Sequence, residues 1–271
     1  MRIETQELVH EYAPGQRALD GVNLIIEGTD PVAIIGQNGA GKTTLVKHFN
    51  GILRPTTGNV LIDGVDIRKH TTAQWSARVG YVFQNPDNQL FMEDVRHEFE
   101  FGPHQIGVPE REIQKRIQGV AELVGLSDKL DVNPADLMPS EKKFCAIGAV
   151  IMMGCDAVVF DEPTCGQDVR GTERLAHIIQ VLRNDGTLCI TISHDVKFVT
   201  RNFPRTVVMC KGNVLAEGET AEVFQQVDLL RQSYVIPPAV SRVARAAGMK
   251  KQAFDVETLM NNIREERDLN E

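Results

Sequence analysis

A glycine-rich segment that ends in lysine and threonine contains the residues of this sequence most clearly suited to chemistry. It follows the apolar run 32–35 and precedes a helical run, 44–49. Glycines let backbone N–H groups converge on phosphate oxygens, a lysine ammonium reaches the terminal phosphates, and a threonine hydroxyl can ligate Mg²⁺. A strand, loop and helix in this order predict a nucleoside triphosphate site. The predicted binding residues are Gly36, Gln37, Asn38, Gly39, Ala40, Gly41, Lys42, Thr43 and Thr44.

Polar residues follow two further apolar runs. Asp161 and Glu162 come directly after the run 158–160, and His194 closes the run 188–192. Found alone, two adjacent acids are usually a solvated turn and a single histidine is usually structural. A phosphate loop on the same sheet favours function instead. Asp161 is then expected to hold Mg²⁺, Glu162 to act as general base on the attacking water, and His194 to contact the γ-phosphate or position the water.

The elements that must position these residues fall into four segments. Residues 1–84 read as short strands and turns, 85–154 as helices, 155–219 as alternating strands and helices, and 220–271 as a charged helical tail broken by a proline pair. Strands that alternate with helices predict a mainly parallel sheet covered on both faces. Within the second segment, apolar residues recur at the spacing that places them on one face of a helix. Its residues are Ile113, Ile117, Val120, Ala121 and Val124.

Composition limits the possible functions. The 271 residues carry a net charge of −8, which gives no general electrostatic reason to expect binding to nucleic acid. The five cysteines form no CxxC pair, so reduced thiols in the cytosol are expected. The longest nearly uncharged stretch, 146–155, is shorter than the roughly 20 apolar residues that cross a bilayer. It is predicted to be a buried helix.

Taken together and in this order, the motifs resemble the ATP-binding-cassette (ABC) family of nucleotide-binding domains. The resemblance implies ATP and Mg²⁺ as cofactors. It implies that Tyr12 stacks on adenine and that Gln84 senses Mg²⁺ and the attacking water and links to a membrane partner. It places residues 164–168 at a dimer contact and makes His194 the switch histidine.

The implied fold is an α/β P-loop NTPase core of the ABC type. It has a mainly parallel sheet, N-terminal antiparallel strands, a helical subdomain at 85–154 and a small helical extension at 220–271. Within the family the chain is most similar to energy-coupling-factor transporter ATPases, which power uptake of vitamins, cobalt or nickel. The similarity lies in residues 84–91 and 100–103 and in the tail, at 220–224 and 237–245.

That resemblance implies separate transmembrane subunits and a peripheral position at the cytoplasmic face of the membrane. It also implies a second ABC ATPase subunit, held in a dimer with the help of the tail. Three other interpretations stay open. One is an ABC ATPase that does not serve transport, and another is a regulatory subunit that binds nucleotide but hydrolyses it weakly. The third is a transporter of another class that uses the same cassette, against which only the tail and the region around Gln84 speak.

One segment departs from the family pattern. Where the family signature LSGGQ is expected, this chain has Leu137, Met138, Pro139, Ser140 and Glu141. Met138 offers no hydroxyl, Pro139 offers no N–H, and Ser140 adds a Cβ where close backbone approach is wanted. Losing one preorganised donor typically costs about 3 kcal/mol, on the order of 100-fold in rate.

In the family this signature touches ATP bound to the opposite subunit, so the defect affects the partner's site. We therefore favour a heterodimer with one competent and one impaired ATP site. A homodimer remains possible and would have two impaired sites. The alternative is that Met138, Pro139 and Ser140 are a tolerated local variant.

Overall fold

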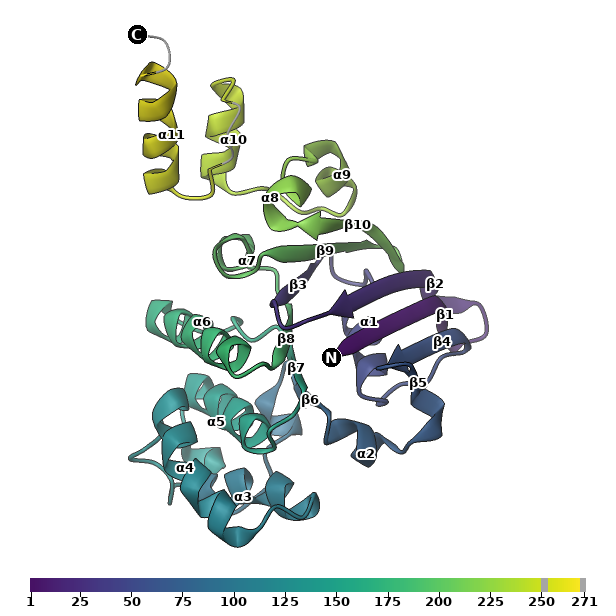
Figure 1. The fold of residues 1–271 in the computed structure, drawn as a ribbon, viewed down its shortest axis with the longest axis vertical. Helices are drawn as coiled ribbons and strands as arrows, with labels where there is room; N and C mark the ends of the chain where they lie inside the picture. Colours follow the sequence, from purple (N-terminus) through teal and green to yellow (C-terminus); the bar gives the residue numbers. More distant parts are fainter. Residues whose placement is uncertain (250–252, 269–271) are drawn as a thin grey trace.

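The computed structural model describes residues 1–249 and 253–268. Its larger sheet has the strand order β10-β9-β3-β8-β7-β6, in which β9, β3, β8, β7 and β6 run parallel and β10 pairs antiparallel to β9 (Figure 1). The strand bounds are β3 Val32–Ile35, β6 Val79–Val82, β7 Ala157–Asp161, β8 Leu188–Ile192, β9 Arg205–Cys210 and β10 Asn213–Glu219. Every residue of β3, β6, β7 and β8 is buried, as expected of strands covered on both faces. The predicted mainly parallel sheet is confirmed.

A second, antiparallel sheet has the order β2-β1-β4-β5. Its strands are β1 Arg2–Ala13, β2 Gln16–Glu27, β4 Thr57–Ile62 and β5 Val65–Asp66. The expectation of short strands in this segment is wrong for β1 and β2, which have 12 residues each. In β1 the pairing register shifts between Thr5 and Leu8, where Glu7 has φ of 45°, and the buried face changes from odd to even positions. This bulge, together with the buried polar residues Thr5 and His10, hides the two-residue alternation.

Helices cover both faces of the larger sheet. Side chains of β3 alternate between two hydrophobic cores, with Ala33 and Ile35 in one and Val32 and Ile34 in the other. The helices around the sheets are α1 Lys42–Phe49, α2 Thr72–Ser76, α6 Val169–Asn184 and α7 Val196–Asn202. Because β3 is fixed from both sides, the loop that follows it starts from a rigid point.

Three helices gather beyond β6 at one end of the molecule (Figure 1). They are α3 Val95–Gln105, α4 Glu110–Val124 and α5 Pro139–Met152. The predicted face of α4 is largely confirmed, since Ile113, Ile117, Ala121 and Val124 are buried and Val120 packs against the core while partly exposed. The predicted buried helix at 146–155 corresponds to the second half of α5, but it is three residues too long, because α5 ends at Met152 and a turn containing Gly154 follows.

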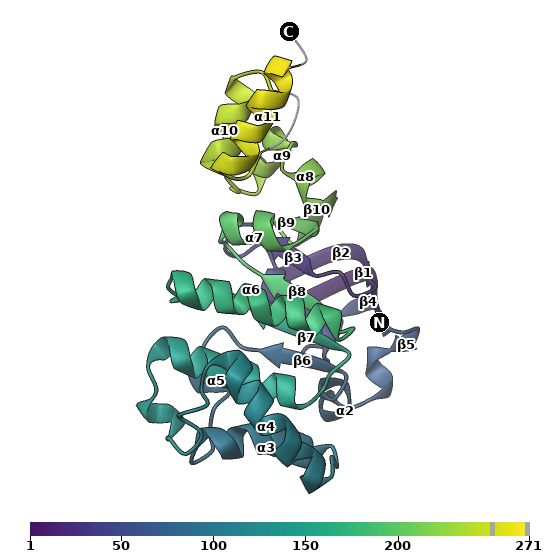
Figure 2. The ribbon, with the colours of Figure 1, turned by 60° about the vertical axis from the view of Figure 1, so that its left-hand side comes forward.

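The tail forms short helices at the opposite end from α3 and α4, as Figures 1 and 2 both show. They are α8 Thr220–Val223, α9 Val227–Gln232, α10 Ala239–Ala246 and α11 Val256–Asp268. The proline pair does break the tail, because α10 begins directly after Pro238. Residues 250–252 and 269–271 of the predicted tail lie outside the described residues. Among the helices described here, none has both the length and the apolar character needed to cross a bilayer.

Helix α1 carries a buried histidine that makes the stability of the fold depend on pH. His48 has no exposed surface, its Nδ1 lies 2.7 Å from the carbonyl oxygen of Thr44, and burial lowers its pKa to about 4. Its contribution is complete above the unfolded pKa of 6.5 and is lost as the pH falls toward 4. Between pH 7.5 and 5, we expect the free energy of unfolding to fall by about 2 kcal/mol more in the unmodified protein than in its His48→Gln variant.

Urea unfolding at both pH values measures this difference. The control is His177→Gln, which replaces an exposed histidine on α6 and leaves the buried one in place. Equal losses in the protein and in His48→Gln would show that His48 does not titrate on unfolding.

Candidate functional site

The loop from Gly36 to Gly41 connects the buried end of β3 to α1. Two of its glycines have no possible replacement at their present positions. A Cβ on Gly36 would lie 2.2 Å from the carbonyl oxygen of Met209, and one on Gly41, where φ is 98°, would lie 2.6 Å from that of Ala18. The loop is thus packed against neighbouring backbone on one side. On the other, residues 38–44 line an open cavity of about 510 Å³.

Lys42 is the first residue of α1, and its almost fully buried side chain lies against this loop. Its Nζ donates hydrogen bonds to the carbonyl oxygens of Gly36, at 2.8 Å, and Gln37, at 3.0 Å. Burial lowers the pKa of Lys42, while the nearby charges of Glu162 and Asp161 raise it. A cation held by the loop at the start of a helix, beside converging backbone N–H groups, is suited to an anionic phosphate chain.

Parallel pairing brings the end of β7 to the same level as the loop. Asp161 is in register with Ile192 of β8, and its Oδ1 accepts a hydrogen bond from Oγ1 of Thr43 at 3.3 Å. Its Oδ2 accepts one from the hydroxyl of Tyr81 at 2.7 Å. A hydroxyl and a carboxylate side by side are the hard oxygen donors that Mg²⁺ prefers, so Thr43 and Asp161 fit this ion.

Glu162 and His194 face each other across the ends of β7 and β8. Nε2 of His194 lies 3.0 Å from Oε1 of Glu162, and the backbone N–H of His194 donates to Oε2 at 3.2 Å. Burial raises the pKa of Glu162, and burial followed by the charge of Lys42 lowers the pKa of His194. Nζ of Lys42 is 3.4 Å from Nε2 of His194. A carboxylate beside a histidine and a phosphate-binding lysine can accept a proton from an attacking water.

The remaining predicted residues lie around this centre. Gln84 lines the same cavity as Lys42, Glu162 and His194, whereas Gly36 and Gln37 line a neighbouring hollow. Tyr12 is 58% exposed, and its hydroxyl lies 3.0 Å from Oγ1 of Thr44. Its predicted stacking on adenine stays a prediction.

Sequence reasoning missed several residues of the site. Thr164, Cys165 and Asp195 also line the cavity, and Tyr81 contacts Asp161. Tyr81 could have been found, because it lies in the apolar run next to the acidic strand in the expected parallel sheet. For Thr164 and Cys165 the family resemblance implies a dimer contact and gives no sign that they line the cavity.

The segment Met138–Ser140, which we call the signature segment, forms a regular helix start. Pro139 is the first residue of α5, a position that suits proline, and Met138 is 59% exposed. The backbone N–H of Met138 donates to Oε2 of Glu141 at 3.1 Å, and Glu141 pairs with Lys129. The departure from the family pattern therefore changes the available donors without unfolding the helix.

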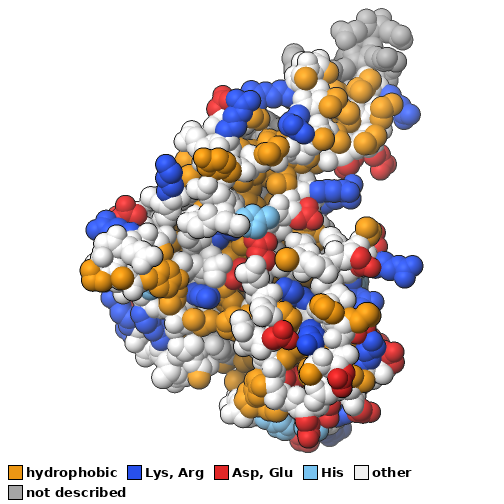
Figure 3. Space-filling view, turned by 180° about the vertical axis from the view of Figure 1, so that it is seen from behind, with side chains coloured by type: hydrophobic (Ala, Val, Ile, Leu, Met, Phe, Trp, Pro, Cys, Tyr) orange, Lys and Arg blue, Asp and Glu red, His pale blue; other side chains and the backbone are white. Residues whose placement is uncertain are grey.

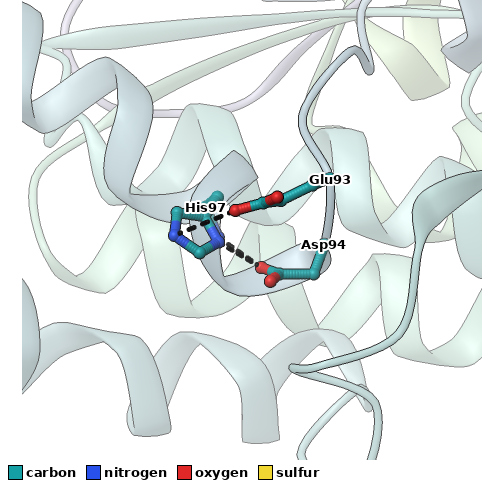
Figure 4. Close-up of side chains that lie close together, drawn as sticks. All are labelled: Glu93, Asp94 and His97. Atoms are coloured by element: carbon teal, nitrogen blue, oxygen red, sulfur yellow. Dashed lines mark hydrogen bonds and ion pairs between the residues drawn. The ribbon is translucent and has the colours of Figure 1, made fainter.

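A separate cluster of Glu93, Asp94 and His97 lies at the start of α3 (Figure 4). Asp94 caps the helix by accepting the backbone N–H of His97 at 2.8 Å, and its Oδ1 is also 2.8 Å from Nδ1 of the His97 ring. The hydrogen bond to Asp94 raises the pKa of His97. Helix capping accounts for this cluster.

Comparisons with known proteins agree with this geometry. Residues 19–165 match the family model described as ABC transporter. The chain is 38% identical to the energy-coupling factor transporter ATP-binding protein EcfA of Methanothermobacter thermautotrophicus, over 94% of this chain and 82% of that protein. It is 36% identical to EcfA2 of Clostridium perfringens, over 94% of this chain and 92% of that protein.

A solved structure with a similar fold is cbiO1 from Clostridium perfringens, described as part of the ABC transporter complex cbiONQ. It has a TM-score of 0.76 and 31% identity and covers 91% of this chain and 98% of that one. The match thus extends beyond the phosphate loop to most of the chain. This chain belongs to the ABC transporter family, as an ATPase of the energy-coupling factor type.

Proposed function

We propose that this chain hydrolyses ATP with Mg²⁺ at the cytoplasmic face of a membrane and drives uptake of a vitamin or a transition-metal ion. The transported substrate would pass through a separate transmembrane subunit. The chain would form one half of an asymmetric ATPase dimer. The observation that carries the proposal is the joint position of Lys42, Glu162 and His194 around one cavity, in a chain whose own signature segment lacks the usual donors.

The roles of the site residues follow from their contacts. Backbone N–H groups of the loop and Lys42 would bind the phosphates, and Thr43, Asp161 and Gln84 would hold Mg²⁺. The metal ion would neutralise phosphate charge during transfer. Glu162 would accept a proton from the attacking water while His194 holds its carboxylate in place.

Exposed hydrophobic side chains on the tail support a contact with a second ATPase subunit. Val243 is 58% exposed, Val256 is 64% exposed and Met260 is 45% exposed. Figure 3 shows hydrophobic side chains gathered at the tail end of the molecule. Apolar side chains that gather on one surface often mark a contact with another protein. We propose that residues 220–271 are a dimerisation extension.

A second exposed group supports a contact with a transmembrane partner. Phe91 is 65% exposed and packs edge-on against Phe101, with ring centroids 4.9 Å apart. It lies at the end of the stretch that begins with Gln84. A membrane subunit that contacts Phe91 would therefore lie close to the segment that leads into the ATP site. Movement of either one would be transmitted to the other through this segment.

The proposed asymmetry predicts how activity depends on the partner. A tagged chain purified from solubilised membranes should bring down a transmembrane protein and a second ABC ATPase. The isolated chain should hydrolyse ATP slowly, and the pair should be faster by on the order of 100-fold, because the partner supplies an intact signature. Phosphate release under matched MgATP measures both rates.

The matched control restores the signature in this chain through Met138→Ser, Pro139→Gly and Ser140→Gly together. The restored variant should raise the activity of the isolated chain if the segment is impaired. Full, cooperative hydrolysis by the unmodified chain alone would reject the asymmetry. Recovery of ribosomes or DNA in place of a membrane protein would reject the transport role.

Substitutions at the two ends of the site should separate binding from turnover. Glu162→Gln removes the proposed base without changing the size of the side chain, so ATP should still bind while turnover at this site falls by about 100-fold or more. Lys42→Ala should weaken binding itself, because it removes the cation that faces the phosphates. Fluorescence titration with a labelled nucleotide, beside a turnover assay, measures both effects. Strong residual hydrolysis by Glu162→Gln would exclude Glu162 as the base.

A further inference from the structure

Lys143 is a buried cation for which the proposed mechanism has no role so far. Among the described residues, Lys42 and Lys143 are the two buried lysines, and Lys143 is only 4% exposed. Taking an ammonium group out of water is costly unless it gains strong hydrogen bonds or a charged partner. The burial of a lysine beside the proposed catalytic centre therefore needs a physical reason, such as contacts that compensate for the lost water.

The contacts of Lys143 supply one. Its Nζ donates a hydrogen bond to the carbonyl oxygen of Gln84 and lies 3.5 Å from the carbonyl oxygen of Glu162. These two carbonyls belong to the proposed metal-sensing glutamine and the proposed general base. A single ammonium group thus connects helix α5, the segment after β6 and the segment after β7.

The backbone of Glu162 has an unfavourable conformation that neighbouring groups must stabilise. Its φ of 51° lies in the left-handed region, which residues other than glycine adopt at a cost and keep only when their surroundings fix them. Its N–H donates to the carbonyl oxygen of Ile192 at 3.0 Å, so β8 holds one side of the residue. The ammonium of Lys143, beside its carbonyl, is placed to hold the other side.

The position of Lys143 along α5 gives this contact a wider consequence. The residue lies one turn into the helix whose first residues are the signature segment. The signature segment would contact a partner subunit, and Glu162 is the proposed base of this chain's own site. One turn of α5 and the ammonium group of Lys143 therefore link the two. A shift of α5 would be passed to Gln84 and Glu162.

We propose that Lys143 is a positioning residue for ATP hydrolysis, whose buried ammonium holds the backbone of Gln84 and Glu162 in place relative to the helix that carries the signature segment. The proposal rests on the proposed function, since it assumes that Glu162 and Gln84 act in turnover. Lys143 does not face the phosphates directly. Its loss should therefore disturb the chemical step and leave nucleotide binding, which depends on the loop around Lys42, nearly intact.

The neighbouring Lys142 offers a matched control. It lies on the same helix, but it is only partly buried, and its Nζ pairs with Asp87 at 3.3 Å. Removing its charge changes the net charge of the protein and the composition of α5 by the same amount as removing that of Lys143. A difference between the two substitutions then reports the buried contacts and not the charge of the helix.

The test measures kcat and KM for MgATP in the full chain co-purified with its native partners. Lys143→Met should lower kcat by on the order of 10- to 100-fold, with KM changed by less than about threefold, because small displacements of reacting groups have effects of this size. Lys143→Arg, which keeps the charge and its donors, should recover part of kcat. Lys142→Met should behave like the unmodified complex.

The outcomes separate the two proposals. A kcat for Lys143→Met within twofold of the unmodified complex would overturn the role of Lys143 alone, as would a loss confined to KM. Absence of turnover in the unmodified complex would overturn the proposed function as well. If Lys143→Met fails to fold, the kcat values of Lys143→Gln and Lys143→Arg are compared instead, provided that the two variants have similar melting temperatures. Equal kcat values for these two variants would contradict the proposal.

Discussion

The parallel pairing of β3, β8 and β7 is the constraint on which the rest of this structure depends. Ile34 and Asp161 are both in register with Ile192, so three segments that are far apart in the chain end at one level. Their buried side chains leave no freedom to slide, because a shift of one residue would move each side chain from one hydrophobic core into the other, where the packing no longer matches. The phosphate loop, the acidic pair and His194 inherit their relative positions from this registry.

Much of this arrangement could be predicted from the sequence because its signals are local. Apolar runs mark the central strands, and the glycine-rich loop with Lys42 has a chemistry that few other patterns share. What escaped prediction depends on tertiary placement. The bulge at Glu7 in β1 disguised a long strand, the hydroxyl of Tyr81 contacts Asp161 only through strand pairing, and Lys143 gave no sign in the sequence that it was buried.

The site also shows how local and global electrostatics can differ. The chain is acidic overall, yet its two buried lysines among the described residues both lie beside the carbonyls and carboxylates of the cavity. The signature segment, by contrast, is exposed at the start of a well-formed helix. In the proposed dimer, the chain would keep the parts of its own site and offer its partner an altered surface. This contrast is the physical reason for proposing an asymmetric pair.

All of this assumes that the loop around Lys42 binds a triphosphate. Calorimetric titration of MgATP into the folded chain, with Glu162→Gln used to keep the nucleotide intact, tests that assumption most directly. We expect saturable binding of one nucleotide per chain, lost when Mg²⁺-nucleotide is replaced by the nucleoside alone. Absence of heat and of saturation with the folded protein would contradict it, and with it both the transport role and the asymmetry.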